Sequence, residues 1–475
     1  MARAGDFARL PLSAARRIAL RPRPPPRPLP APPPAREQVS LRRMVRHGSL
    51  STLRHKPFRL FLLARLISMS GTAMAPVALA FAVFGFDSSP ASLAIVLAAN
   101  TAPQLVLLLV GGVIADRFSR QRVIVIGNVL PAVTQGCVAL LVATGTATTG
   151  RIALFAALAG CASALTQPAM NSLLPQLVDP GELQQANALM RLPGNLIRIL
   201  APAVGGALVA FVGPELTLGW DAASFAVAAF LCGRLDVSGP AKTAASVFRD
   251  FKDGWKEFSR LFWIWSYTLS GTVVVALWLG GYQLLGPVMA QNSHLGAPSW
   301  GIVQGAFAAG LLLGGIVSLK WKPSRIMVVC VCANLPLALP FLALAWGAPL
   351  AVLAGASVMA GIGLDIAIVC WNTAVQEQLP SEVLGRVSSL SSAGELMSVP
   401  LGYLVVGAAA TSLGTESVLL WSAALMVLAS LVLLLAPSVW AVRRLPADPG
   451  PAAVAAGGQD RGARTGRAPD QVARP

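Results

Sequence analysis

The chain has 475 residues, of which 55% belong to the hydrophobic set and only 12% are charged. Soluble domains carry about 25% charged residues, so this composition excludes an ordinary soluble globular protein. The hydrophobic residues gather in runs longer than the ~20 residues that an α-helix needs to cross a bilayer. The sequence therefore predicts a polytopic helical membrane protein.

The formal net charge of +17 is concentrated at the two ends of the chain. Residues 1–56 hold twelve Arg and one Lys against two acidic residues, and residues 437–475 hold six Arg against three Asp. The first segment is rich in Pro and has no secretory hydrophobic stretch, so we expect both segments to be disordered basic tails rather than nucleic-acid-binding domains. Met44 stands shortly before the first apolar run, so a start at Met44 instead of Met1 is an alternative.

Apolar runs in chain order predict twelve membrane spans. Six lie in the first half, at approximately residues 58–86, 91–114, 123–144, 151–174, 187–211 and 216–233. Six more follow, at approximately 262–290, 299–319, 326–347, 349–373, 385–411 and 417–436. We expect an all-α membrane protein in which residues 57–233 and 262–436 form two pseudo-symmetric six-helix bundles. Twelve spans place both ends of the chain on the same side of the membrane.

A charged linker, residues 234–261, separates the two predicted bundles. Its aromatic residues fit one face of an amphipathic helix at the membrane surface: Phe248, Phe251, Trp255 and Phe258. The loops on the side of this linker carry thirteen Lys and Arg residues, whereas those on the other side carry Arg151 alone. Because cationic loops are retained in the cytoplasm, we expect both termini and the linker to be cytoplasmic. The excess of Arg over Lys favours a bacterial protein, and hence the bacterial plasma membrane.

The two halves repeat a pattern. Three residues around the start of the fifth span recur 200 residues later: Pro180, Glu182 and Gly194, then Pro380, Glu382 and Gly394. The Gly pair at 111–112, after span two, likewise corresponds to the Gly pair at 314–315, after span eight. Duplicated halves around a central site are typical of secondary transporters that rock one half against the other.

The most specific motif is GVIADRFSRQR at residues 112–122. It resembles the signature loop of the major facilitator superfamily, G-x-L-A-D-R-x-G-R-[RK], and stands in the same place between spans two and three. Ser119 and Gln121 depart from the pattern. The resemblance implies a latch between the halves, closed against the start of span eleven near residues 385–386 and formed by Gly112, Asp116, Arg117, Arg120 and Arg122. The alternative is a basic loop that only sets topology.

Span five adds a second likeness. Its segment RILAPAVGG, residues 198–206, is similar to the GPxxGG-like segment of exporters in this superfamily and keeps Pro202, Gly205 and Gly206. Ala201 replaces the usual Gly. The resemblance covers approximately residues 50–436 and is closest to the branch that includes the enterobactin exporter and macrolide-efflux-like permeases. It implies the major facilitator fold and export by antiport.

Ionisable residues inside the predicted spans are candidates for ion coupling, because a charge at membrane depth costs at least a few kcal/mol. Asp365 and Glu395 would take up and release protons, unless they are paired structural carboxylates or Glu395 lies nearer the cytoplasmic surface. Arg65 and Arg198 would line the cavity as counter-charges, unless they extend to the inner membrane interface.

The substrate cavity is predicted from an interrupted helix and from polar residues at membrane depth. Span seven contains a run of Gly and Pro at residues 280–287, and such interruptions tend to line cavities. We expect a largely apolar pocket with a few hydrogen-bonding groups, formed by Met69, Met74, Gln167, Asn171, Trp278, Tyr282, Gln283, Trp371 and Asn372. The alternative is that the Met and aromatic residues pack in the core.

Together these features predict a proton-coupled efflux permease that exports small lipophilic organic compounds, such as drugs or secondary metabolites, by alternating access. The expected partners are membrane lipids, the substrate and protons; a monomer without cofactor, metal ion or nucleic acid is expected. The chain has no GxxxxGK[ST] loop and only three His, so an enzyme is not expected. Uptake of a metabolite and a transport-inactive sensor or scaffold are the alternatives.

Overall fold

The computed structural model describes residues 51–115, 120–235, 258–293 and 295–444. Within these residues the regular structure is helical, and twelve segments are long and apolar enough to cross a membrane. The prediction of an all-α protein with twelve spans is therefore confirmed. Three predicted segments lie largely or wholly outside the described residues. They are the two tails except for residues 51–56 and 437–444, most of the linker, and residues 116–119 of the signature loop.

The first half consists of α2 (Lys56–Phe84), α3 (Pro90–Ala115), α4 (Arg120–Ala143), α5 (Thr149–Leu177), α6 (Leu183–Val212) and α7 (Pro214–Gly233). Two 3-10 turns, η1 (Ser51–Arg54) and η2 (Pro180–Glu182), precede α2 and α6. A single residue, Gly213, joins α6 to α7 with a φ of 89°. This left-handed conformation suits glycine, and it allows the chain to reverse without a longer loop.

The second half begins with one span built from α9 (Phe262–Trp278), the π-helix η3 (Leu279–Leu285) and α10 (Gly286–Asn292). The spans that follow are α11 (Gly296–Lys320), then α12 (Ile326–Cys332) with η4 (Leu335–Ala338) and α13 (Leu339–Ala345), then α14 (Leu350–Gln378), α15 (Ser381–Leu413) and α16 (Thr415–Leu434). The predicted interruption of span seven is thus present as a π-helix. A short helix, α17 (Pro437–Ala441), follows the last span. The sequence assigns residues 51–56 and 437–444 to the tails, but parts of both segments are helical. The helical region therefore begins a few residues earlier and ends a few residues later than predicted.

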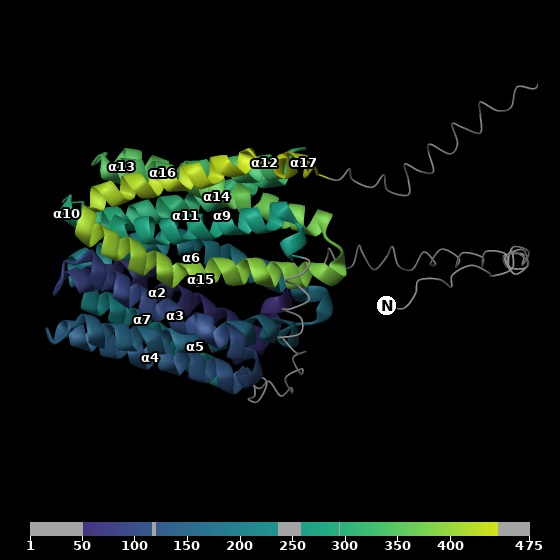
Figure 1. Ribbon diagram of the computed structural model, residues 1–475. Coiled ribbons are helices and arrows are strands. Elements are labelled where there is room, and N and C mark those ends of the chain that lie inside the picture. Colours follow the sequence, from purple (N-terminus) through teal and green to yellow (C-terminus); the bar gives the residue numbers. More distant parts are fainter. Residues whose placement is uncertain (1–50, 116–119, 236–257, 294, 445–475) are drawn as a thin grey trace, which may run out of the picture. The chain divides into compact units, whose positions relative to one another are not determined.

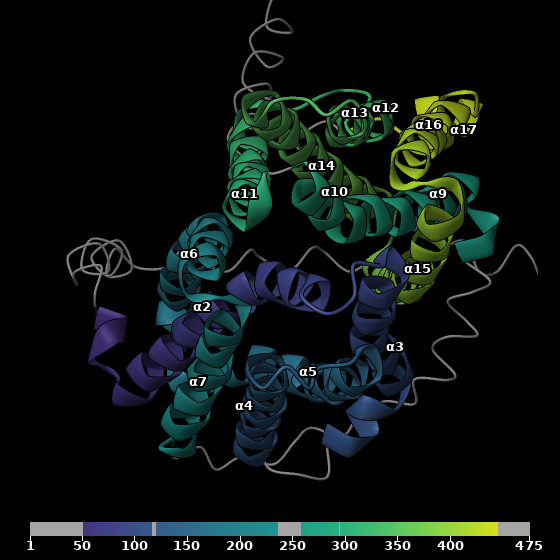
Figure 2. The ribbon, with the colours of Figure 1, turned by 90° about the vertical axis from the view of Figure 1, so that its left-hand side faces the viewer.

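Two groups of helices are visible when the bundle is viewed along its helices (Figure 2). One group contains α2 to α7 and the other contains α9 to α17. Figure 1 shows the same helices from the side, where α6 and α15 overlap in the view. The groups touch where α6 packs against α11 and where α15 packs against α3. This is the expected pair of six-helix bundles.

Buried apolar residues form one shared core at one end of the helices and two separate cores at the other. The shared core joins both halves and includes Leu93 of α3 and Trp300 of α11. At the opposite end, Phe61 belongs to a core of the first half and Ile264 to a core of the second. We call the shared end the outer end, because the Lys and Arg counts assign its loops to the outside, and the opposite end the inner end.

Glycines bring α6 and α11 into backbone contact across the two halves. A Cβ atom added at Gly206 would overlap the carbonyl oxygen of Ala297, and one added at Gly301 would overlap the carbonyl oxygen of Pro202. One added at Gly305 would lie 2.6 Å from a carbonyl oxygen of α6. The exporter-like segment of span five and the glycines of span eight therefore form the seam between the halves toward the outer end.

Candidate functional site

A cavity of about 310 Å³ lies inside the first half, among α2, α4, α5, α6 and α7. The described residues that line it are Arg65, Ser68, Met69, Thr72, Ala73, Gly127, Asn128, Pro131, Ser163, Thr166, Met170, Arg198 and Phe225. At a rise of 1.5 Å per residue, Arg65 lies roughly 14 Å and Arg198 roughly 22 Å from the inner ends of their helices. The cavity is therefore near the middle of the spans.

A glycine allows α4 and α5 to pack closely where they line the cavity. A Cβ atom added at Gly127 would lie 2.9 Å from the Cβ of Thr166, so a larger residue would push α5 away. The hydroxyl of Thr166 donates to the carbonyl of Ala162 at 2.6 Å, and the amide of Asn128 donates to the carbonyl of Ile124 at 2.7 Å. These polar side chains line the cavity, and each donates one hydrogen bond to a carbonyl of its own helix.

Three residues predicted from the sequence meet at this cavity: Arg65, Arg198 and Met69. Within the described part of the chain, no ion pair involves either arginine. Met69 packs against α6, where a Cβ added at Gly194 would lie 3.1 Å from its methyl carbon. Both arginines therefore lie at the cavity, while their role as counter-charges stays a prediction.

The two predicted carboxylates lie in the second half and do not line this cavity. Asp365 of α14 faces α11, where a Cβ added at Gly315 would lie 3.5 Å from its Oδ2. This Oδ2 atom is buried, and no described group hydrogen-bonds to it. Glu395 of α15 faces α9, with its Oε1 3.6 Å from a Cβ added at Gly271.

A third membrane-depth carboxylate, Asp221 of α7, was missed by the sequence reasoning. Its side chain is buried with 1% exposure, and its Oδ1 has no hydrogen-bond partner among the described residues. It packs against Gly71 of α2, where an added Cβ would lie 2.6 Å from Oδ1. The sequence did indicate it, because Asp221 is an acidic residue inside the predicted span 216–233. Asp365 was selected because it is an ionisable residue inside a predicted span, and the same reason applies to Asp221.

The structure corrects the expected role of the aromatic residues in span seven. Trp278 and Tyr282 stack with their ring centroids 4.3 Å apart, and both side chains are buried in the shared core. The Tyr282 hydroxyl donates to the carbonyl of Val303 at 3.2 Å. Gln283 accepts a hydrogen bond of 2.9 Å from Gln304. These residues pack within the second half and are not among the described residues that line the cavity.

The other expected pocket residues are dispersed. Met74 packs against Gly205, where an added Cβ would lie 2.9 Å from the Cβ of Met74. Trp371 stacks on Tyr267 at 4.5 Å, and Asn372 is exposed on α14. These contacts are packing contacts, as in the alternative interpretation of Met and aromatic residues.

The predicted latch stays a prediction. Gly112 belongs to the end of α3, and Arg122 is exposed near the start of α4. Asp116 and Arg117 lie outside the described residues, as do the side chains of Arg120, Gln167 and Asn171.

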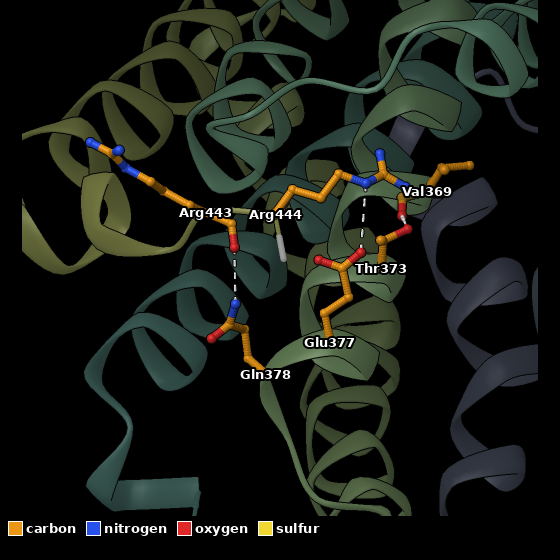
Figure 3. A network of polar contacts seen from close by, with 6 residues as sticks. All are labelled: Val369, Thr373, Glu377, Gln378, Arg443 and Arg444. Atoms are coloured by element: carbon orange, nitrogen blue, oxygen red, sulfur yellow. Dashed lines mark hydrogen bonds and ion pairs between the residues drawn. The ribbon is translucent and has the colours of Figure 1, made fainter. Parts of the chain in front are cut away.

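Polar contacts at the inner end hold the segment after α17 against α14 (Figure 3). The Nε of Arg444 lies 3.6 Å from Oε1 of Glu377, and the amide of Gln378 donates to the carbonyl of Arg443 at 3.0 Å. The backbone N–H of Arg444 donates to the carbonyl of Ser324 at 3.0 Å. This segment thereby ties the last span to the inner ends of α12 and α14.

One group of side chains has the atoms for a metal site. Candidate ligand atoms of His55, Asp179 and Glu182 lie within 4.8 Å of one another at the inner end of the first half. Nε2 of His55 and Oε2 of Glu182 are 3.0 Å apart. This hydrogen bond accounts for the grouping without an ion.

Known proteins share both the sequence pattern and the fold. A family model described as transmembrane secretion effector matches residues 47–449. The multidrug efflux pump Tap of Mycolicibacterium fortuitum is 24% identical over 400 residues, covering 82% of this chain and 97% of that protein. The enterobactin exporter EntS of Citrobacter koseri is 26% identical over 376 residues, covering 76% and 86%.

Among solved structures, the nucleoside transporter NupG matches with a TM-score of 0.66 at 15% identity, covering 80% of this chain and 98% of that one. A bacterial homologue of the iron transporter ferroportin in an inward-facing state matches with a TM-score of 0.65 at 20% identity, covering 80% and 98%. These structures share the fold of twelve helices in two bundles. The family match extends over most of the chain, and the chain therefore belongs to the transmembrane secretion effector family of the major facilitator superfamily.

Proposed function

We propose that this efflux-type membrane transporter is a proton-coupled exporter of small lipophilic organic compounds and works by alternating access. The observation that carries the proposal is the mid-span cavity in the first half, whose lining combines apolar side chains with a few polar groups. This combination is typical of sites for organic molecules. The multidrug and enterobactin exporters among the relatives support export as the direction.

Proton coupling is supported by the carboxylates within the spans. Oxygen atoms of Asp221 and Asp365 are buried without a described hydrogen-bond partner, and Glu395 lies at similar depth in α15. A charged carboxylate in the hydrocarbon layer costs about 2.5–3.5 kcal/mol on insertion scales, and protonation removes that cost. Protonation would therefore favour one conformation, and substrate binding would favour another.

Alternating access is supported by the arrangement of the cores. The two halves share a core at the outer end, whereas each has a separate core at the inner end. This is the arrangement expected of a state that is closed to the outside. Export would require the seam between α6 and α11 to separate while the inner ends approach one another.

Everted bacterial membrane vesicles that contain the protein provide the test. A lipophilic compound that is exported should partly collapse an imposed pH gradient, as measured with a pH-sensitive fluorescent dye. We expect at least one of Asp221→Asn, Asp365→Asn and Glu395→Gln to abolish this response while substrate binding persists. Glu416→Gln is the matched control, because Glu416 is exposed at the outer end of α16. Parent-like responses from all three variants would contradict proton coupling through these carboxylates.

A further inference from the structure

We propose that the cavity of the first half selects organic anions, that is, molecules with an apolar body and one carboxylate, sulfonate or phosphate group. This inference rests on the proposed function, because it specifies the charge of the exported compound.

The cavity carries positive charge without a described counter-charge. Arg65 of α2 and Arg198 of α6 both line it, and none of the described lining residues is acidic. Neither guanidinium takes part in an ion pair within the described part of the chain. Two like charges at membrane depth repel one another, and Arg65, which is partly buried while Arg198 is exposed, also loses hydration. An anion bound between them would relieve both effects.

The donors that remain for a ligand are mainly those of the arginines. Three lining hydroxyls donate to carbonyls of their own helices: Ser68 to Arg65 at 3.1 Å, Thr72 to Ser68 at 2.9 Å and Thr166 to Ala162 at 2.6 Å. Each guanidinium offers five N–H donors in a planar fork that matches a carboxylate, sulfonate or phosphate. The cavity is therefore rich in donors suited to an anionic group.

Most of the remaining wall is apolar. Met69, Ala73, Pro131, Met170 and Phe225 line the cavity together with the arginines. Its volume of about 310 Å³ lies at the lower end of the range for small-molecule sites. A compact aromatic or aliphatic body would fit this wall, whereas a lipophilic cation would be repelled by the same arginines.

The three membrane-depth carboxylates are not among the described residues that line the cavity. Asp221 lies at the contact of α7 with Gly71 of α2, Asp365 faces α11 and Glu395 faces α9. In this conformation none of them forms a described ion pair with Arg65 or Arg198, so a bound anion would supply the counter-charge.

Binding of three matched probes to the full-length protein tests the inference. Dansylglycine is anionic, its amide is neutral, and dansylcadaverine is cationic, while all three carry the same ring system. The protein is reconstituted in nanodiscs of phosphatidylcholine, and Kd is measured from dansyl fluorescence. We expect dansylglycine to bind at least about tenfold more tightly than its amide, and dansylcadaverine to bind most weakly, since charge-assisted hydrogen bonds are among the strong ones.

Variants identify the residues responsible. Arg65→Gln and Arg198→Gln should each weaken dansylglycine binding by about tenfold to hundredfold, the effect of one charge-assisted hydrogen bond, and change amide binding by less than about twofold. Arg65→Lys and Arg198→Lys should recover part of the loss, because the charge is kept. Arg191→Gln is the matched control, since Arg191 is exposed on α6 and is not among the lining residues. Unchanged amide binding also shows that a variant is folded.

Equal binding of the three probes, or parent-like preference in both Gln variants, would overturn the inference. Loss of the dansylglycine preference in nanodiscs that contain phosphatidylglycerol would overturn it as well, because a lipid headgroup would then be the anion in the cavity. Transport without proton coupling, together with charge-selective binding, would remove the proposed coupling and leave the anion site intact. Proton-coupled transport of cationic probes alone would refute the anion site and leave the proposed proton coupling intact.

Discussion

Replacing Gly301 by alanine should shift the protein away from the state that is closed at the outer end. An added Cβ would lie 2.9 Å from the Cα of Ala203 and 3.0 Å from the carbonyl carbon of Pro202. Carbon atoms pack best at about 3.5–4.0 Å, so α6 and α11 must separate by about 0.5–1 Å at this point. Both atoms belong to the backbone, which cannot rotate away as a flexible side chain would.

The size of the shift follows from the location of the contact. Adding a methyl group to a well-packed interface costs about 1–3 kcal/mol. Gly301 meets α6 across the seam between the halves, so this free energy is lost from the outer-closed state and not from the packing within either half. The ratio of outer-closed to outer-open molecules should therefore fall by about 5-fold to 150-fold.

Distances between spin labels at the outer end measure this ratio. Phe211 of α6 and Gln291 of α10 are exposed and suit labelling through cysteine substitution, after the six native cysteines have been replaced. Gly301→Ala should increase the longer-distance population. Gly355→Ala in α14 is the control, since an added Cβ there meets no atom within 4 Å. A folded Gly301→Ala protein with the parent distance distribution would refute the reasoning.

Three further substitutions test the packing by thermal unfolding in detergent. Gly71→Ala should destabilise the protein by about 1–3 kcal/mol, because the added Cβ would lie 2.8 Å from the Cα of Asp221; an unchanged Tm would contradict the contact between α2 and α7. Tyr282→Phe removes a buried hydroxyl that hydrogen-bonds to α11 and should cost about 0.5–1.5 kcal/mol, so a gain in stability would contradict that bond. Arg444→Ala breaks a partly exposed ion pair with Glu377 and should cost at most about 1 kcal/mol, with transport unchanged.

The spans could be predicted because one property, apolar length, determines them. Each predicted run corresponds to a helical span within a few residues, and the Gly and Pro residues after Trp278 correctly indicated an interruption. A bilayer requires its backbone hydrogen bonds to be satisfied within each span, so long apolar runs leave few alternatives to helix.

The cavity was harder to predict, because these helices are apolar on most faces. In a soluble helix the polar face shows which side is buried, but a span apolar all round carries no such mark. Depth could therefore be predicted, whereas rotation about the helix axis could not. Trp278 and Tyr282 have cavity-like composition and point into the core, while Arg65 and Arg198 reach one cavity from helices far apart in the sequence.

An asymmetry between the halves bears on which one carries the substrate. The mid-span region of the first half is open and holds the two arginines. In the second half, Trp278 stacks on Tyr282, and Phe307 packs against both rings at tilted angles. A close-packed aromatic core of this kind moves as a rigid body, because separating its rings would lose many contacts at once. In the proposed cycle the ligand would therefore stay with the arginines of the first half. The second half would move away from it at the outer seam and toward it at the inner ends, which changes the side from which the cavity is reached.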